Sequence, residues 1–232
     1  MPEDMFEQGV EHVEQAARRL CEETGKAPDG LSIQAALDEL ADYSMLTRQG
    51  GGMVTVHRMV QEVLRSQIPG PQRAWIEGTL RIVNRAFPFD SDDVRTWPVC
   101  DRLRPHARRI SASADEEGIT DPTSRLMNQL GGLFLYKGLY SQAEPLMRRA
   151  LGIDEGAFGN DHPAVAIRLN NLALLLQDTN RLAEAEPLIR RALAIDEVAF
   201  GNDHLDVAID LNNLALLLKA TNRLAEAEPL MR

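Results

Sequence analysis

Apolar residues in the second half of the chain have the spacing of amphipathic helices. Val165, Leu169 and Leu172 recur at intervals of three and four residues, which places them on one face of a helix. A second stretch with this spacing begins at Leu182, and Asn180 stands between the two. Asparagine tolerates the left-handed backbone conformation in which many helices end, so the pattern predicts two helices joined by a tight turn.

This helix pair recurs along the sequence with a period of 42 residues. The segment LNNLALLLQDTNRLAEAEPLIR at 169–190 returns as LNNLALLLKATNRLAEAEPLMR at 211–232, and a more divergent copy, MNQLGGLFLYKGLYSQAEPLMR, occupies 127–148. The connecting sequence AFGNDHPAVAI at 157–167 also returns, as AFGNDHLDVAI at 199–209. A fixed period of this length indicates a solenoid, in which each helix pair packs on the next.

Residues at fixed places in each copy mark the expected helix ends. Asp161 is a favourable N-cap, and Pro163 suits the first turn of the helix that follows. Gly138 and Asn222 occupy the turn between the two helices in the first and third copies. The copies are therefore predicted to begin and end their helices at equivalent positions.

The repeated words resemble the 42-residue tetratricopeptide repeats typical of kinesin light chain. The resemblance rests on L-N-N-L-A-L-L-L, on the A-E-A-E-P-L block and on the G-N-D-H-P linker, and it covers Thr123 to Arg232. It implies an α-α superhelical solenoid, in which the first helix of each pair lines a concave surface that binds peptide segments of partner proteins. Because the last copy stops within its second helix, we expect further repeats to follow in a longer protein.

A different pattern occupies residues 1–68. The stretches 31–43 and 57–65 have helical spacing, and two short β-prone runs separated by glycines predict a hairpin over 45–56. Helix, hairpin and helix in this order predict a winged-helix unit. The fold class expected for the whole chain is therefore mainly α, with one small β-hairpin.

The first half also resembles a known family. The words P-E-D-M-F, A-L-D-E-L-A-D-Y-S-M-L-T-R and V-H-R-M-V-Q-E-V-L-R resemble the winged-helix segment after the ATPase core of NB-ARC signalling proteins that carry tetratricopeptide repeats. FDSDDVRTWP at 89–98 and LRPHA at 103–107 are similar to the connecting region of that group. The chain contains no G-x-x-x-x-G-K-[ST] motif, so we expect no nucleotide site and no other cofactor.

Residues 69–122 are expected to form an irregular helical connector. Apolar residues at spacings of three and four predict a helix over 72–87, and a second helix is predicted over 96–110. The polar sequence SASADEEGIT at 111–120 predicts a loop or linker. The expected divisions of the chain are thus a winged-helix-like domain at 1–68, the connector at 69–122 and the repeats at 123–232.

The charge of the chain argues against nucleic acid and anionic membranes as partners. The 25 Lys and Arg residues and 35 Asp and Glu residues give a formal net charge of −10. Met1–Gly70 carry 12 acidic and 6 basic residues, and the helix expected at 31–43, which would read a DNA groove, has no Lys or Arg. A packing role for this unit fits its charge better than DNA binding does.

Cysteine use and the lack of apolar runs indicate the compartment. Cys21 and Cys100 are 79 positions apart and match no metal or redox spacing, which is typical of reduced thiols in an intracellular protein. No stretch of about 18 apolar residues occurs, and the acidic N-terminus has no signal-peptide core. We therefore expect a cytoplasmic protein that neither crosses nor binds membranes.

We find no set of residues suited to catalysis or metal binding. His162 and His204 share one repeat position at a helix start, where capping or packing of the linker accounts for them. His57 and His106 have no carboxylate or cysteine nearby at ligand spacing, and no G-x-S-x-G occurs. We expect no metal site and no enzyme activity.

The candidate binding residues are polar side chains on the first helix of each repeat. Asn170 and Asn171 stand among leucines, as do Asn212 and Asn213, although asparagine is a mediocre helix former. An asparagine amide suits the backbone of an extended peptide, and the tetratricopeptide resemblance implies that one of each pair contacts ligand. The alternative is that one asparagine bonds the neighbouring repeat and stabilises stacking. The partner-binding residues predicted in this way are Asn128, Arg168, Asn170, Asn171, Gln177, Asn212, Asn213 and Lys219.

Together these features predict a non-catalytic protein-interaction module. It would serve as sensor or scaffold of a larger NB-ARC-type signalling switch, with a protein or peptide ligand in the concave face of the solenoid. The alternative is a structural spacer or a self-association element that associates through its last repeat.

Overall fold

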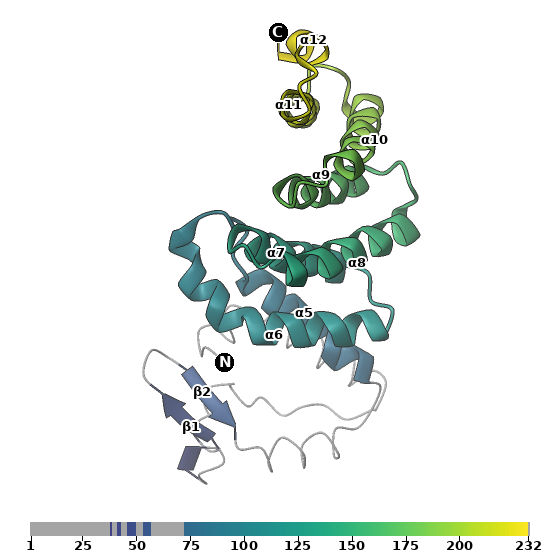
Figure 1. Cartoon of the computed structure of the whole chain (residues 1–232). Coiled ribbons are helices and arrows are strands. Elements are labelled where there is room, and N and C mark those ends of the chain that lie inside the picture. The colour runs from purple at the N-terminus through teal and green to yellow at the C-terminus, as the bar shows by residue number, and fades with distance from the viewer. Residues whose placement is uncertain (1–37, 39–40, 43–45, 50–52, 57–71, 232) are drawn as a thin grey trace. The chain divides into compact units, whose positions relative to one another are not determined.

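The computed structural model describes residues 38, 41–42, 46–49, 53–56 and 72–231. The chain divides into two compact units, Met1–Thr123 and Ser124–Arg232. In Figure 1 the second unit runs from teal to yellow. The finer division of the first unit near residue 68 stays a prediction.

The first unit contains a small β-hairpin. Strands β1 (Leu46–Gln49) and β2 (Met53–Val56) are antiparallel, with Leu46 opposite Val56 and Gln49 opposite Met53. This confirms the hairpin predicted from the glycine-separated runs. The helices predicted at 31–43 and 57–65 lie outside the described residues, except that Asp38, Ala41 and Asp42 are helical. The winged-helix arrangement therefore stays a prediction.

Two packed helices follow the hairpin. Helix α5 (Gln72–Ala86) and helix α6 (Trp97–Glu116) are joined through a 3-10 turn at Val94–Thr96. Asp93 caps this turn by accepting a hydrogen bond from the Arg95 backbone N–H at 2.9 Å. Leu80 and Val83 are buried, which confirms the apolar side predicted for the first helix.

The linker expected at 111–120 is wrong for its first six residues, because α6 continues through Glu116. Ser111 and Ala114 are buried, and the Ser111 hydroxyl donates to the Arg108 carbonyl oxygen at 3.2 Å. Burial of these side chains outweighs the polar composition that favoured a loop, and the hydrogen bond satisfies the buried hydroxyl. The helix ends before Gly118, which has a φ of 66°.

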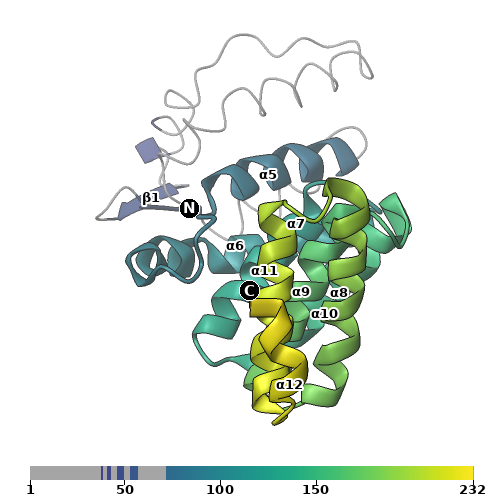
Figure 2. The same cartoon turned by 90° about the horizontal axis from the view of Figure 1, so that it is seen from above.

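The second unit consists of successive antiparallel helices, which pack side by side in Figures 1 and 2. The two-helix repeat predicted from the sequence is confirmed. The third pair differs from the others, since its second member is a single helical turn followed by a 3-10 turn at Glu228–Met231. The helices are α7 (Thr123–Tyr136), α8 (Tyr140–Phe158), α9 (Pro163–Asp178), α10 (Leu182–Phe200), α11 (Leu205–Ala220) and α12 (Leu224–Ala227).

The turn inside each pair is left-handed, as predicted. Gly138, Asn180 and Asn222 have φ angles of 71°, 58° and 60°. In the second repeat the Arg181 N–H donates to the Leu176 carbonyl oxygen at 2.7 Å, which closes the end of α9. A residue that tolerates positive φ at this position therefore sets where the chain reverses.

The helices α9 and α11 begin at histidine caps. His162 Nδ1 accepts a hydrogen bond from the Ala164 N–H at 3.1 Å, and His204 Nδ1 accepts one from the Asp206 N–H at 3.2 Å. Each imidazole also stacks on the phenylalanine that ends the preceding helix, with ring centroids 4.7 Å and 4.4 Å apart. This confirms the capping role expected for the histidines and corrects the choice of Asp161 as the N-cap of α9.

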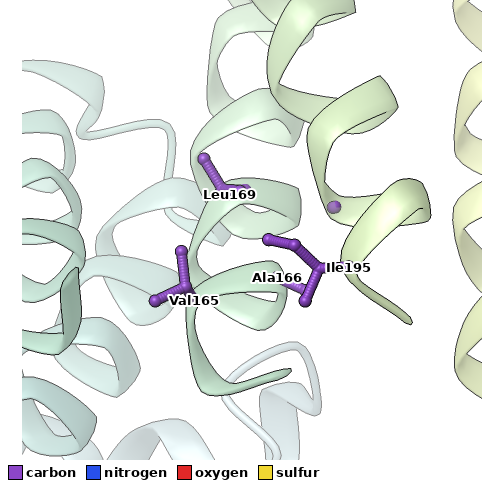
Figure 3. Packing of buried hydrophobic residues seen from close by; sticks show 5 residues of the cluster. Val165, Ala166, Leu169 and Ile195 are labelled. Carbon is purple, nitrogen blue, oxygen red and sulfur yellow. The ribbon is translucent and has the colours of Figure 1, made fainter. Parts of the chain in front are cut away.

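Clusters of buried apolar residues hold the helices of the repeats together. Figure 3 shows the cluster that Val165, Ala166 and Leu169 on α9 form with Ile195 on α10, and Leu151 packs against the same cluster. Small residues allow close approach elsewhere in the unit. A Cβ added to Gly131 on α7 would lie 2.7 Å from Met147 Cγ on α8, so glycine is the residue that fits there.

Candidate functional site

Half-buried ion pairs link the second helices of successive repeats. Arg181, which precedes α10, donates to Glu144 of the preceding repeat at 2.9 Å and to Glu184 of its own repeat at 2.7 Å. Arg223 lies 42 residues later and makes the same two contacts, with Glu186 and Glu226. Hydrogen bonds from these arginines lower the pKa of Glu184 and Glu226. The repeated contacts keep successive copies in one register.

A buried ion pair joins the first and second repeats. Arg168 on α9 donates from Nε to Asp154 on α8 at 2.8 Å, and the two residues are 9% and 1% exposed. A pair removed from water to this extent is held by its mutual charge, because either ion alone would be left without solvation. The sequence predicts Arg168 as a partner-binding residue. In the structure its guanidinium bonds Asp154 between two repeats and is buried, so the candidate surface lies elsewhere.

Among the described residues, Asn170 bonds a neighbouring repeat, whereas Asn171 and Asn213 do not. Asn170 on α9 donates from its amide to Asp210 on α11, so this side chain bonds the neighbouring repeat. Asn171 and Asn213 are half-buried, and neither makes a side-chain hydrogen bond to any other described residue. The stacking alternative therefore accounts for the first asparagine of this pair, and the second remains available to a partner.

The other predicted residues differ in how far they are exposed to solvent. Asn128 on α7 is buried, and so is Gln129, the residue that replaces the second asparagine in the first repeat. Asn212 and Lys219 on α11 are exposed, and Gln177 on α9 is half-buried. The accessible polar positions thus lie on α9 and α11 rather than on α7.

Aliphatic side chains flank the two available asparagines. Ile167 is 52% exposed and lies four residues before Asn171, and Ile209 is 45% exposed and lies four residues before Asn213. Residues four apart share one side of a helix, so each isoleucine neighbours its asparagine. Leu216, three residues after Asn213, is 49% exposed. We define the candidate surface as Ile167, Asn171, Ile209, Asn213 and Leu216.

The aliphatic part of this surface is not among the residues predicted from the sequence. The signal was present, since Ile167 and Ile209 are 42 residues apart and interrupt the polar side of their helices. An apolar residue outside the buried stripe and repeated with the period is the pattern that would have found it.

Comparison with known proteins identifies the repeats. The profile of the tetratricopeptide repeat family matches residues 122–197 and 169–232. Residues 122–232 are tetratricopeptide repeats. This confirms the resemblance drawn from the repeated words, and the helix pairs of the second unit are the expected structure of such repeats.

Solved structures with the same fold include kinesin-light-chain-type proteins. A protein of this type from Podosopora anserina, with nearly identical TPR-like repeats, is 14% identical, with a TM-score of 0.56 over 97% of this chain and 91% of that one. BtubC (BKLC) from P. vanneervenii is 19% identical, with a TM-score of 0.54 over 99% of this chain and 87% of that one. At such identities the likeness concerns the fold alone.

One curated relative is similar in sequence. It is a nucleotide-binding leucine-rich repeat (NLR)-like protein of Hyaloscypha variabilis, 29% identical over 132 residues. The match covers 55% of this chain and 13% of the relative, so this chain spans only a small part of that protein's length.

No helix among the described residues has both the length and the apolar character needed to cross a membrane. The described part of the chain likewise holds no group of three His, Cys, Asp or Glu residues arranged to bind a metal ion.

Proposed function

We propose that the tetratricopeptide repeats of this chain bind an extended peptide segment of a partner protein across α9 and α11. The observation that supports this is the pair Asn171 and Asn213, 42 residues apart, accessible and without a side-chain hydrogen bond to other described residues. Each amide can donate to and accept from a peptide backbone, and the repeat spacing offers two such contacts in a row. The chemistry is binding and requires no cofactor.

The aliphatic side chains of the candidate surface indicate what the peptide carries. Ile167, Ile209 and Leu216 would bury apolar area against small or aliphatic side chains, while the asparagines hold the backbone between them. Lys219, Gln177 and Asn212 would contact polar side chains at the edge of the surface.

We further propose that these repeats are the sensor or scaffold part of a larger NB-ARC-type signalling protein. The NLR-like relative supports this context, as does the resemblance of the first half to the winged-helix segment of that group. In such a protein, a peptide held by the repeats would change the restraint on an ATPase module.

The test is the double variant Asn171→Ala plus Asn213→Ala. Losing two backbone contacts of about 1 kcal/mol each should weaken binding roughly 30-fold for a peptide selected from a displayed library on the full chain. The melting temperature should stay nearly constant, because neither side chain bonds another described residue. Calorimetric titration and thermal unfolding measure the two effects.

The matched control is Asp178→Ala, an exposed residue on α9 outside the candidate surface. This control should bind the selected peptide like the unchanged chain. Equal affinity of the double variant and the control would refute the assignment of the surface.

The competing function is self-association. Leu205 and Leu224 in the third repeat are 72% and 57% exposed, and Leu216 adds to the accessible apolar area. A second copy of the chain would bury these side chains without any peptide ligand.

A further inference from the structure

The two junctions between repeats use different chemistry at equivalent positions. At the first junction, Asp154 on α8 pairs with Arg168 on α9. Forty-two residues later the same two positions carry Asp196 on α10 and Asp210 on α11. The second junction therefore places two acids where the first has an acid and a base.

Both acids of the second junction are buried. Asp196 is 3% exposed and Asp210 is fully buried. Asp210 Oδ1 accepts a hydrogen bond from the Asn170 amide on α9, whereas Asp210 Oδ2 and Asp196 Oδ1 accept none from any described donor. Positions 196 and 210 are the equivalents of 154 and 168, whose side chains meet at 2.8 Å, and a hydrogen bond between the Asp196 and Asp210 side chains contributes to the pKa of each. Two carboxylates offer only acceptors, so they can bond each other only when one of them carries a proton.

The surroundings of the pair favour that proton. Burial is the largest cause that raises the pKa of Asp210 from 3.8 to about 6, and burial also raises the pKa of Asp196. Asp206 on α11 raises both values further. The Asn170 amide on α9 opposes the shift at Asp210, and His204 in the turn before α11 opposes it at Asp196. Arg168 is the basic residue of α9, and its charge is paired with Asp154 at the first junction.

We propose that the junction between the second and third repeats is a proton-dependent contact. With one proton shared between Asp196 and Asp210, the junction is closed and α11 packs on α9 and α10. Without that proton, two buried negative charges repel each other, and the closing equilibrium shifts towards a state in which the third repeat is separated from the second. Opening would also break the candidate surface, since Ile209 and Asn213 lie on α11.

The direction of the pH effect follows from linkage. The closed junction binds the proton more tightly than the open one, because the pKa of Asp210 is raised in the closed state. The stability that the pair gives to the closed junction is therefore complete below the ordinary pKa of 3.8 and is lost as pH rises through about 6. With a pKa of 3.8 in the open state and about 6 in the closed state, the equilibrium constant for closing should fall roughly 30-fold between about pH 4.5 and pH 7.5.

The experiment is hydrogen exchange of the α11 amides in the full chain at these two pH values, corrected for intrinsic exchange rates. Protection of α11 should fall roughly 30-fold at the higher pH in the unchanged chain. In the variant Asp210→Asn, protection of α11 should be high at both pH values. An amide at this position still accepts a hydrogen bond from Asn170 and can donate one to Asp196. The control Asp178→Asn removes an exposed acid and should follow the unchanged chain.

A second variant covers the case in which the amide disturbs packing. Asp210→Arg should rebuild the acid–base pair of the first junction with Asp196, and it too should protect α11 equally at both pH values. The proposal is overturned if Asp210→Asn and Asp210→Arg both keep the pH dependence of the unchanged chain, or if both lose protection throughout. It is also overturned if Ca²⁺ or Mg²⁺ restores protection at the higher pH in the unchanged chain alone, since a cation would then take the place of the proton.

Discussion

At the scale of single residues, one position sets the kind of buried polar contact between two successive repeats. The side chain is Arg168 in the second repeat and Asp210 in the third, and both face an aspartate of the preceding helix. In the first case opposite charges attract, and in the second the contact depends on a proton. At the second junction the Asn170 amide also donates a hydrogen bond to Asp210.

Arg168→Ala should destabilise the chain by about 3–5 kcal/mol, because Asp154 would be left buried without its partner. Chemical denaturation followed by circular dichroism measures the change. The comparison variant Arg181→Ala removes a half-buried arginine that also bridges two repeats, and it should have a much smaller effect because its ion pair is far more accessible to water. Similar losses in the two variants would show that burial does not set the strength of the Arg168 pair.

At the scale of elements, helix ends are set by short contacts that recur with the period. Asn180 and Asn222 adopt positive φ in the turns, and His162 and His204 cap the helices that follow the linkers. The extension of α6 shows the opposite situation. There the sequence contains no stop signal before Gly118, and the burial of Ser111 keeps a polar stretch helical.

His162→Ala should cost about 1 kcal/mol of stability, since the Ala164 N–H at the start of α9 loses its acceptor and Phe158 loses its stacked ring. Thermal unfolding measures this loss. Asp161→Ala is the matched control, because Asp161 precedes the cap and is exposed. A larger effect from Asp161 than from His162 would return the capping role to the aspartate.

At the scale of the whole molecule, the repeats form a unit with its own core, and their accessible apolar side chains permit two kinds of partner. Ile167 and Ile209 accompany the free asparagines, which favours a peptide. Leu205 and Leu224 are exposed in the third repeat, which favours a second copy of the chain. The area needed for a stable dimer is large, so a few exposed leucines alone are a weak basis for one.

We therefore expect the full chain to have a molar mass independent of concentration. Light scattering coupled to size-exclusion chromatography measures it over a wide concentration range. A mass that rises with concentration in the unchanged chain, and stays constant in Leu205→Ser plus Leu224→Ser, would favour self-association over peptide binding.

The repeat fold could be read from the chain because its rules are local. The 42-residue period, the turn residues at Asn180 and Asn222 and the glycine-separated hairpin all depend on neighbours in sequence. The roles of the candidate residues depended on which helices come together. The sequence predicts Arg168 as a ligand contact, whereas the fold pairs it with Asp154. The sequence does not distinguish Asn170 from Asn171, whereas the fold pairs only Asn170 with Asp210. A side chain's partner is set by packing between helices distant in sequence, and local patterns carry no record of it.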